Sequence, residues 1–358
     1  MLSDVEVGAF LSGGVDSGYL ASASGADQAF TVGFDEGDRY SEVNKAAKVA
    51  EKAGLKHHVK IISKQEFWDA LPDVMYHMDE PLGDASAVAL YFLSKEAAGH
   101  VKVVLSGEGA DELFGGYNIY REPEALKKVA WIPFRLRRAV RKLAAKLPDV
   151  KGRDFLIRAG MKVEERFIGN AYIYREKEKA QILKNKVTGP STQEYLSQFY
   201  EELESENRDS LQDMEKMQSV DLNYWLPGDI LQKADKMSMA HSLEVRVPFL
   251  DKEVFNFAAK LPKEAKIAAG TTKYIFRKAV SEFLPQETNE RKKLGFPIPI
   301  RVWLRQNDWY QMVTDLFTSK EAEDFFHTEK LLQLLNDHKD KKADNSRKIW
   351  TVLTFLIW

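Results

Sequence analysis

The chain has 358 residues, enough to bury a substantial core in one large domain or in two smaller ones. Its 52 basic and 54 acidic residues give a formal net charge of −2, so no global field attracts nucleic acid or an anionic membrane. The absence of cysteine excludes disulfides, thiolate metal sites and a cysteine nucleophile within this chain. Residues 1–8 lack the pattern of a signal peptide, and the apolar stretch 349–358 is too short to span a bilayer. We therefore expect a cytoplasmic protein.

Residues 1–120 alternate apolar strand patterns with helical patterns. The expected strands are residues 5–11, 28–34, 56–62 and 101–105. The expected helices are residues 17–24, 41–54, 64–78 and 86–99. This alternation is typical of βαβ units, so the sequence predicts an α/β fold with a doubly wound, mostly parallel sheet. Because such sheets bind ligands beyond the carboxyl ends of their strands, we expect residues 1–120 to bind a nucleotide.

The rest of the chain is expected to be mainly helical. Residues 121–225 are predicted to form a helical insertion, and residues 226–358 to hold further motifs and closing helices. The stretch 127–158 is locally basic, which would suit either a nucleic-acid-binding arm or a solvated helix face. We favour the solvated face, because apolar residues are interleaved with the basic ones and acidic stretches balance the charge.

The first motif, Ser-Gly-Gly-Val-Asp-Ser at residues 12–17, follows a strand and opens a helix. Glycines allow backbone N–H groups to surround an anion, and the helix N-terminus adds partial positive charge, so the motif predicts a phosphate-binding loop. It is not a Walker A loop, because the lysine is missing and Asp16 carries the opposite charge. An acid beside phosphates is repulsive unless a divalent cation lies between them. A turn capped by serine is the simpler alternative.

The second motif, Ser-Gly-Glu-Gly-Ala-Asp-Glu at residues 106–112, also follows a strand. It brings three carboxylates, Glu108, Asp111 and Glu112, to the edge of the sheet where the phosphate loop is expected. Carboxylates gathered there need Mg²⁺, a lysine or a proton between them. A solvated acidic turn is the alternative.

Two further segments carry charged residues in a recognisable pattern. In segment 229–251 the expected helix places three apolar residues on one face: Ile230, Ala234 and Met237. Three charged residues share the neighbouring face: Asp229, Lys233 and Lys236. Alone, this pattern indicates an amphipathic helix packed on a core and followed by a strand. In the basic loop 290–299, Lys292 and Lys293 taken singly would be surface lysines.

Together these motifs resemble a known family. The loop at 12–17 resembles the PP-loop of ATP pyrophosphatases, which split ATP between its α- and β-phosphates. The whole of residues 2–358 resembles the synthetase domain of glutamine-hydrolysing asparagine synthetases. The matching blocks are residues 3–17, 79–94, 105–117, 238–251 and 291–299. The last three are specific to that family, whereas the first indicates only a PP-loop.

The resemblance implies a carbon–nitrogen ligase that uses ATP and Mg²⁺. In that family the side-chain carboxylate of aspartate attacks the α-phosphorus of ATP, which gives β-aspartyl-AMP and pyrophosphate. Ammonia then displaces AMP and leaves asparagine. A homodimer is compatible with the resemblance, and nucleic acid and membrane partners are not expected.

Each functional position of the family has a counterpart here by resemblance. Backbone groups would hold adenosine at four positions: Leu11, Val32, Ser106 and Gly107. The loop residues Ser12, Gly13, Gly14, Asp16 and Ser17 would take the pyrophosphate.

Asp16 and Asp111 match the Mg²⁺ ligands, and Glu108 matches a carboxylate needed for adenylation and for handling the ammonia proton. Lys293 matches a lysine that stabilises charge on the transferring phosphate, so Glu108, Asp111 and Lys293 are the expected catalytic residues. Four weaker candidates for substrate or structural roles are Asp79, Glu80, Asp84 and Arg246.

Full-length members of that family carry an N-terminal glutaminase domain with a catalytic cysteine, and this chain has none. We therefore expect an excised domain, a fragment, or an enzyme that receives ammonia from elsewhere, using glutamine only if a glutaminase domain is supplied.

Several rival functions stay open. β-Lactam synthetases share the adenylation step but carry tyrosine at the place of Glu108, and lasso-peptide cyclases are also related. A tRNA-modifying PP-loop enzyme has only the basic stretch in its favour. A non-catalytic interaction module is disfavoured because the acidic motifs are intact.

Overall fold

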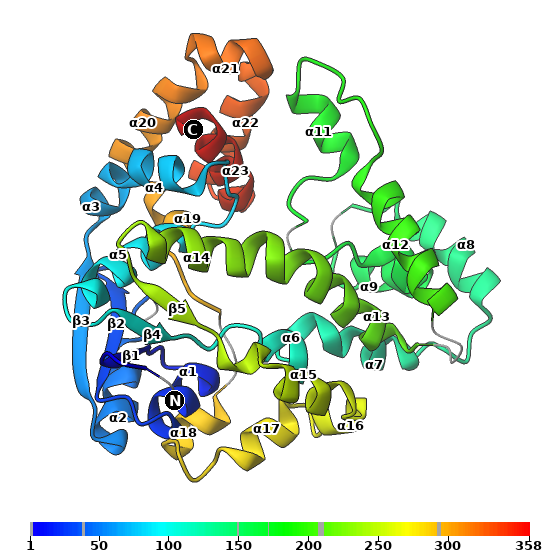
Figure 1. Cartoon of the computed structure of the whole chain (residues 1–358). Helices are drawn as coiled ribbons and strands as arrows, with labels where there is room; N and C mark the ends of the chain where they lie inside the picture. Colours follow the sequence, from blue (N-terminus) through cyan, green and yellow to red (C-terminus); the bar gives the residue numbers. More distant parts are fainter. Residues whose placement is uncertain (1–2, 38–39, 149, 171, 207–210, 292–294) are drawn as a thin grey trace.

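The structure is a computed structural model of the chain, shown in Figure 1. It describes residues 3–37, 40–148, 150–170, 172–206, 211–291 and 295–358. Within these residues no helix is both long and apolar enough to cross a membrane.

A five-stranded parallel sheet forms the centre of the N-terminal part. Its strands are β1 (Val7–Phe10), β2 (Gln28–Phe34), β3 (Lys56–Ile62), β4 (Val103–Leu105) and β5 (Glu244–Arg246). They lie in the order β3-β2-β1-β4-β5, and every neighbouring pair is parallel. The four predicted strands are confirmed, with slightly narrower bounds, and the strand predicted after segment 229–240 is the edge strand β5. The predicted parallel α/β sheet is therefore correct.

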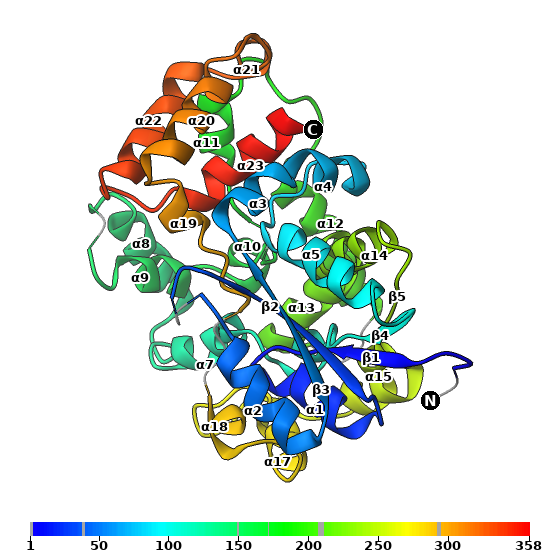
Figure 2. The same ribbon diagram turned by 90° about the vertical axis from the view of Figure 1, so that its left-hand side faces the viewer.

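Helices cover both faces of this sheet, as Figures 1 and 2 show. The helices α1 (Val15–Ala23) and α2 (Val43–Ala53) pack on one face, and α5 (Ser86–Ala98) packs on the other. Successive strand residues alternate between the faces, so Ala9 joins the core under α1 and Phe10 joins the core under α5. The doubly wound arrangement fixes which strand ends are free to bind a ligand.

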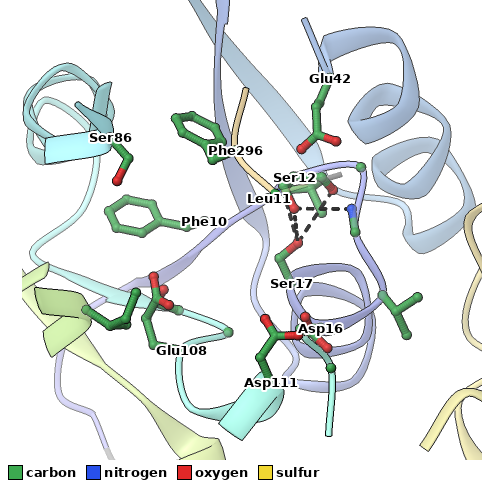
Figure 3. Close-up of a pocket in the computed structure, with 18 of the residues that line it drawn as sticks. Phe10, Leu11, Ser12, Asp16, Ser17, Glu42, Ser86, Glu108, Asp111 and Phe296 are labelled. Atoms are coloured by element: carbon green, nitrogen blue, oxygen red, sulfur yellow. Dashed lines mark hydrogen bonds between the residues drawn. The ribbon is translucent and has the colours of Figure 1, made fainter. Parts of the chain in front are cut away.

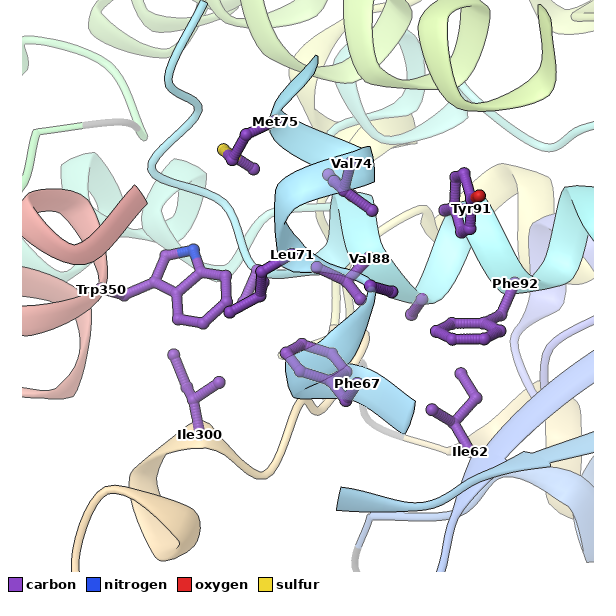
Figure 4. Packing of buried hydrophobic residues seen from close by; sticks show 14 of the residues in the cluster. Ile62, Phe67, Leu71, Val74, Met75, Val88, Tyr91, Phe92, Ile300 and Trp350 are labelled. Carbon is purple, nitrogen blue, oxygen red and sulfur yellow. The ribbon is translucent and has the colours of Figure 1, made fainter. Parts of the chain in front are cut away.

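The larger core lies on the α5 face and extends into the C-terminal helices. It joins Phe30 and Ile62 of the sheet to Phe67, Leu71 and Trp350, which Figure 4 shows in part. The closing helices are α19 (Ile300–Trp303), α20 (Asn307–Phe317), α21 (Lys320–Phe325), α22 (Thr328–Lys339) and α23 (Ser346–Ile357). The C-terminal segment is therefore packed onto the sheet domain through this core.

One predicted helix is divided in two. Residues 64–78 form α3 (Lys64–Asp69) and α4 (Leu71–Met78), with Ala70 between them. Pro72 lies in the first turn of α4, where its missing N–H is tolerated, but it cannot donate to a preceding turn. The proline therefore makes a new helix start favourable at this point.

The segment between β4 and β5 is almost entirely helical. Its elements are α6 (Ala110–Phe114), η1 (Asn118–Arg121), α7 (Glu122–Lys127), α8 (Phe134–Ala144), α9 (Arg153–Ala159), α10 (Val163–Arg166), α11 (Glu176–Ile182), α12 (Thr192–Glu206), α13 (Asp213–Val220), the π-helix η2 (Asp221–Leu231) and α14 (Gln232–Met239). A separate apolar cluster that includes Tyr120, Phe167 and Met217 holds part of it together. The predicted boundaries at residues 120 and 225 stay a prediction.

After β5 come η3 (Pro248–Leu250), α15 (Lys252–Ala259), α16 (Lys263–Lys266), α17 (Tyr274–Ala279) and α18 (Gln286–Glu290). They lie below the sheet in Figure 1, on the side of α1 and α2. Lys273, the residue before α17, has a backbone φ of 53°, in the left-handed region that non-glycine residues seldom adopt.

Candidate active site

A cavity of about 370 Å³ opens at the carboxyl ends of β1, β2 and β4. The loops that follow β1 and β4, which carry the two predicted motifs, both line it. Figure 3 shows how Phe10, Ser12, Asp16, Glu108 and Asp111 face this space. The cavity therefore lies where a doubly wound sheet is expected to bind its ligand.

The loop at 12–17 has the local structure of an anion-binding loop. The Ser12 and Ser17 hydroxyls lie 2.8 Å apart, the Ser17 Oγ accepts the Ser12 N–H at 3.0 Å, and these bonds shape the turn. Gly14 is extended and precedes α1, and no described side chain caps that helix N-terminus. The first turn of α1 therefore lines the cavity without a side-chain cap, and its N–H groups give it partial positive charge.

The loop after β4 approaches the phosphate loop at backbone distance. A Cβ atom on Gly107 would lie 3.1 Å from the backbone N of Ser17 and 3.1 Å from the Asp16 Cβ. Only glycine allows two loops to pass so closely without displacement, which explains the residue type at this position. Ser106 donates its N–H to the Arg246 carbonyl at 2.8 Å, and this bond fixes the loop against β5.

A buried lysine lies between the two aspartates of the predicted metal site. The Lys273 ammonium is 2.5 Å from Asp16 and 2.7 Å from Asp111, and its side chain is 3% exposed. Burial lowers the pKa of Lys273, while the charge of Asp16 acts in the opposite direction. The requirement for a cation between these carboxylates is thus met here by a lysine that sequence reasoning missed.

The same pair of carboxylates could hold a divalent cation. Asp16 and Asp111 point toward each other in Figure 3, and both reach the position of a single ammonium nitrogen. Carboxylate oxygens are the ligands that Mg²⁺ prefers, so this donor set fits the ion. Gly116 contributes the space, because a Cβ there would collide with the Asp111 carboxylate.

A second buried lysine lies at the other end of the cavity. Lys233 donates to Asp84 at 2.5 Å and to Asp229 at 3.0 Å, and all three side chains belong to segments that approach the pocket. Burial alone would lower the pKa of Lys233, but the charges of Asp84 and Asp229 outweigh it and raise that pKa. Glu108 also interacts electrostatically with Lys233. This end of the cavity therefore carries a permanent positive charge beside carboxylates.

Apolar side chains and backbone groups form the remaining wall. Leu11 and Val32 line the cavity and are buried, and Phe10 and Phe296 add aromatic surface. Ser106 and Gly107 also line it. The four positions expected to hold adenosine are therefore brought together around one space.

The basic loop 290–299 reaches the cavity at its edge. Arg291 is paired with Glu42 at 2.8 Å, and Arg291, Gly295 and Phe296 line the pocket. Lys293, the lysine predicted to act on the phosphate, lies outside the described residues. Arg291 and Gly295, the nearest described residues before and after it, line the cavity.

A buried acidic network begins at the residue that follows Asp111. Tyr117 donates to Glu112 at 2.5 Å, and burial raises the pKa of Glu112 to about 7. Tyr120 donates to Asp221 at 2.6 Å, and burial raises the pKa of Asp221 to about 7. The third carboxylate of the second motif is therefore turned into the protein, whereas Glu108 faces the cavity.

Of the four weaker candidates for substrate or structural roles, one lines the cavity and three do not. Asp84 lines the cavity, while Asp79 is paired with Lys236 and Glu80 accepts from Gln232 at 2.5 Å, both on the solvent side of α14. Arg246 contacts Glu244 at 2.6 Å. Within the described part of the chain, only Asp84 of these four lines the pocket.

Comparison with known proteins gives matches that cover most or all of this chain. A family model described as asparagine synthase matches residues 1–358. The glutamine-hydrolysing asparagine synthetase 1 of Bacillus subtilis (strain 168) is 47% identical over 363 residues, covering 100% of this chain and 56% of that protein. The putative glutamine-hydrolysing asparagine synthetase of Mycobacterium tuberculosis (strain ATCC 25618 / H37Rv) is 42% identical, covering 100% of this chain and 55% of that protein. The amidase chry2 of Gibberella zeae is 24% identical over 90% of this chain. The chain spans about half the length of these relatives.

Proposed function

Because the chain belongs to the asparagine synthase family, we propose that its cavity converts aspartate to asparagine with ATP and ammonia. The resemblance of the sequence motifs to this family is confirmed, and the asparagine synthetases among the relatives carry the name of a ligase, as we expect from the motifs. The observation that carries the proposal is one cavity lined by the loop 12–17, by the carboxylates of Asp16 and Asp111 that share the Lys273 ammonium, and by Glu108.

ATP would occupy the end of the cavity nearest α1. Its β- and γ-phosphates would lie on the loop 12–17, where the N-terminus of α1 supplies backbone donors. Asp16 and Asp111 would hold Mg²⁺, which neutralises phosphate charge when bound. Lys273 would then turn its ammonium from the carboxylates to the phosphates, keeping the local charge balanced. Lys293 would add positive charge at the α-phosphate.

The amino acid would occupy the opposite end. A free amino acid carries an ammonium and a carboxylate on one carbon, and Lys233 beside Asp84 presents the complementary charges side by side. The α-carboxylate would lie on Lys233 and the α-ammonium on Asp84. This orientation directs the side-chain carboxylate of aspartate toward the phosphate end.

The reaction then proceeds in two displacements. An oxygen of the side-chain carboxylate attacks the α-phosphorus, the bond to the bridging oxygen breaks, and pyrophosphate leaves. Ammonia attacks the acyl carbon of β-aspartyl-AMP, and AMP leaves from that carbon. Glu108 faces the same space and would accept the proton that the nitrogen loses.

The composition of the chain bears on the nitrogen source. An amide nitrogen is a poor nucleophile because its lone pair is delocalised, and this chain has no cysteine to hydrolyse glutamine. We propose that free ammonia is the substrate of this chain, and that glutamine serves only where a glutaminase domain supplies ammonia.

A product analysis tests this function directly. The purified chain is incubated with ATP, Mg²⁺, aspartate and ammonium, and asparagine, AMP and pyrophosphate are quantified. Equal amounts of the three products support the proposal. Formation of ADP, or equal AMP release with unrelated carboxylic acids in place of aspartate, contradicts it. Amide formation from another carboxylic acid but not from aspartate would favour the β-lactam synthetase or lasso-peptide cyclase alternative.

A further inference from the structure

Three potential metal ligands lie together far from the cavity. His58 of β3, Glu96 of α5 and His100 after that helix bring their ligand atoms within 4.8 Å of one another. The rings of His58 and His100 have centroids 4.0 Å apart, and His100 lies 3.7 Å from Glu96. None of the three lines the active-site cavity.

The chemical class of these ligands is characteristic of transition metals. Two imidazoles with one carboxylate are a recurrent set for Zn²⁺, with bonds of about 2.0–2.2 Å, which places tetrahedral donors about 3.4 Å apart. The ligand atoms now lie within 4.8 Å of one another, so side-chain rotations would have to bring them closer. Glu96 and His100 are free to make them, because their side chains are 32% and 36% exposed.

A second layer of hydrogen bonding prepares His58 for this role. Its Nε2 lies 2.9 Å from the Gln28 Oε1, which can only accept, so the ring proton is on Nε2 and the Nδ1 lone pair is available. The Gln28 amide in turn donates to Glu6 at 3.2 Å.

Because successive residues of β3 point to opposite faces of the sheet, His57 is not part of this cluster. His57, the preceding residue, points to the opposite face, where it bonds to Thr31 at 2.7 Å. His58 instead stacks on Phe30 of β2, with ring centroids 5.0 Å apart. The cluster thus faces the C-terminal end of α5.

Its place in the fold separates it from the catalytic end of the sheet. Ser86, at the start of α5, lines the cavity, whereas Glu96 lies about 15 Å further along the same helix. His100 precedes β4, while Ser106 follows it. A metal bound here would not touch the substrates.

We propose that His58, Glu96 and His100 form a site for one Zn²⁺ or a similar divalent transition metal, with water completing the coordination. Because β3 is an edge strand, the metal would fasten it to the end of α5 and stabilise the folded chain. Cu²⁺ and Ni²⁺ would compete, since imidazole sites also favour them.

The test is Zn²⁺ binding by the full chain. The buffer contains excess Mg²⁺ throughout, so that sites made only of carboxylates are already occupied. Zn²⁺ is titrated by calorimetry, and thermal unfolding is measured with and without Zn²⁺. Wild type is expected to bind one Zn²⁺ and to unfold at a higher temperature when it is present. His100→Gln and Glu96→Gln are expected to weaken binding at least tenfold and to remove the temperature shift, with synthetase activity unchanged.

A matched control is His327→Gln. His327 lies 3.8 Å from Glu329 but has no second histidine beside it among the described residues, so Zn²⁺ binding should stay at the wild-type level. The proposal is overturned if wild type binds no Zn²⁺, or if His100→Gln binds it as tightly as wild type. His100 is exposed, so we expect its replacement to leave the fold intact, and the melting curve without Zn²⁺ checks this.

Discussion

The two ends of the cavity are built on the same charge pattern. At the phosphate end Lys273 lies between Asp16 and Asp111, and at the opposite end Lys233 lies between Asp84 and Asp229. The pKa values of the two lysines shift in opposite directions. Burial dominates at Lys273 and lowers its pKa, whereas the two carboxylates dominate at Lys233 and raise its pKa.

This difference suggests different tasks for the two lysines. A lysine whose ammonium is poorly stabilised is suited to give up its aspartates to a metal and turn to phosphate oxygens. A lysine held firmly by two carboxylates is suited to present a fixed charge to a small zwitterion. In the function proposed above, one lysine and two aspartates would thus form an exchangeable cation site at one end and a permanent recognition site at the other.

The largest expected effect comes from Glu108, which lies between the two ends. Glu108→Gln keeps the side-chain shape but removes the charge and the proton acceptor, so asparagine formation should fall by at least a thousandfold. Folding should be unaffected, because the residue is on a polar loop facing the cavity. Steady-state turnover and a melting curve check both points. Turnover within tenfold of wild type would show that Glu108 has no central role.

The next effect separates the ends by their metal dependence. Asp111→Asn removes one anionic oxygen donor from the phosphate end and should raise the Mg²⁺ concentration for half-maximal activity by about tenfold or more. Asp229→Asn makes the same change beside Lys233 and should leave the Mg²⁺ requirement as in wild type. Mg²⁺ titrations of both variants provide the measurement. Equal shifts in the two variants would contradict the assignment of the metal to one end.

A smaller effect is expected for substrate recognition. Lys233→Gln removes a charge-assisted contact of about 1.5–3 kcal/mol, so KM for aspartate should rise roughly 10- to 100-fold while KM for ATP changes little. Lys236→Gln, three residues along on the exposed side of α14, is the control and should leave both values unchanged. Because Lys233 is buried, a melting curve must first show that the variant is folded. A selective loss of ATP affinity would show that Lys233 contacts ATP and not aspartate.

The smallest expected effect concerns stability and leaves the chemistry alone. Burial raises the pKa of Asp221 to about 7, above its ordinary value near 3.8, so the folded chain keeps a proton that the unfolded chain has lost. Stability from this group is complete below about pH 4 and is lost as the pH rises through 7, by up to about 1.4 kcal/mol per pH unit. Asp221→Asn removes the titration, so the free energy of unfolding should decline less between pH 5 and 7. Denaturant unfolding of both proteins at the two pH values decides the matter, and parallel declines would show that Asp221 is ionised in the folded chain.

The phosphate end was largely predictable from the sequence, and the reason is local. Ser12, Asp16 and Gly107 lie in short motifs placed directly after apolar strands, and the parallel sheet brings those strand ends together. Even the need for a cation between Asp16 and Asp111 follows from their charges. Lys273 could not be found, because it is 257 positions from Asp16 and belongs to no motif.

The end of the cavity at Lys233 was only half predictable. The helical pattern correctly grouped Asp229 with Lys233, since residues four apart share a face. It could not show that this face is buried against Asp84, which is 149 positions away, so an exposed polar face was the natural expectation. The same pattern correctly predicted that Met237 is buried in the core. Periodicity identifies which residues are neighbours on a helix, but the partner of that face is decided by tertiary packing.

The most direct test of the central claim is aspartate-dependent exchange of labelled pyrophosphate into ATP, measured with no nitrogen source. If both ends of the cavity act together, wild type exchanges label only when aspartate and Mg²⁺ are present, because adenylation is reversible before ammonia enters. Lys233→Gln should recover the exchange at high aspartate, whereas Glu108→Gln should show none at any concentration. Exchange that does not depend on aspartate, or none in a folded wild-type chain that makes asparagine, would contradict adenylation of aspartate in this cavity.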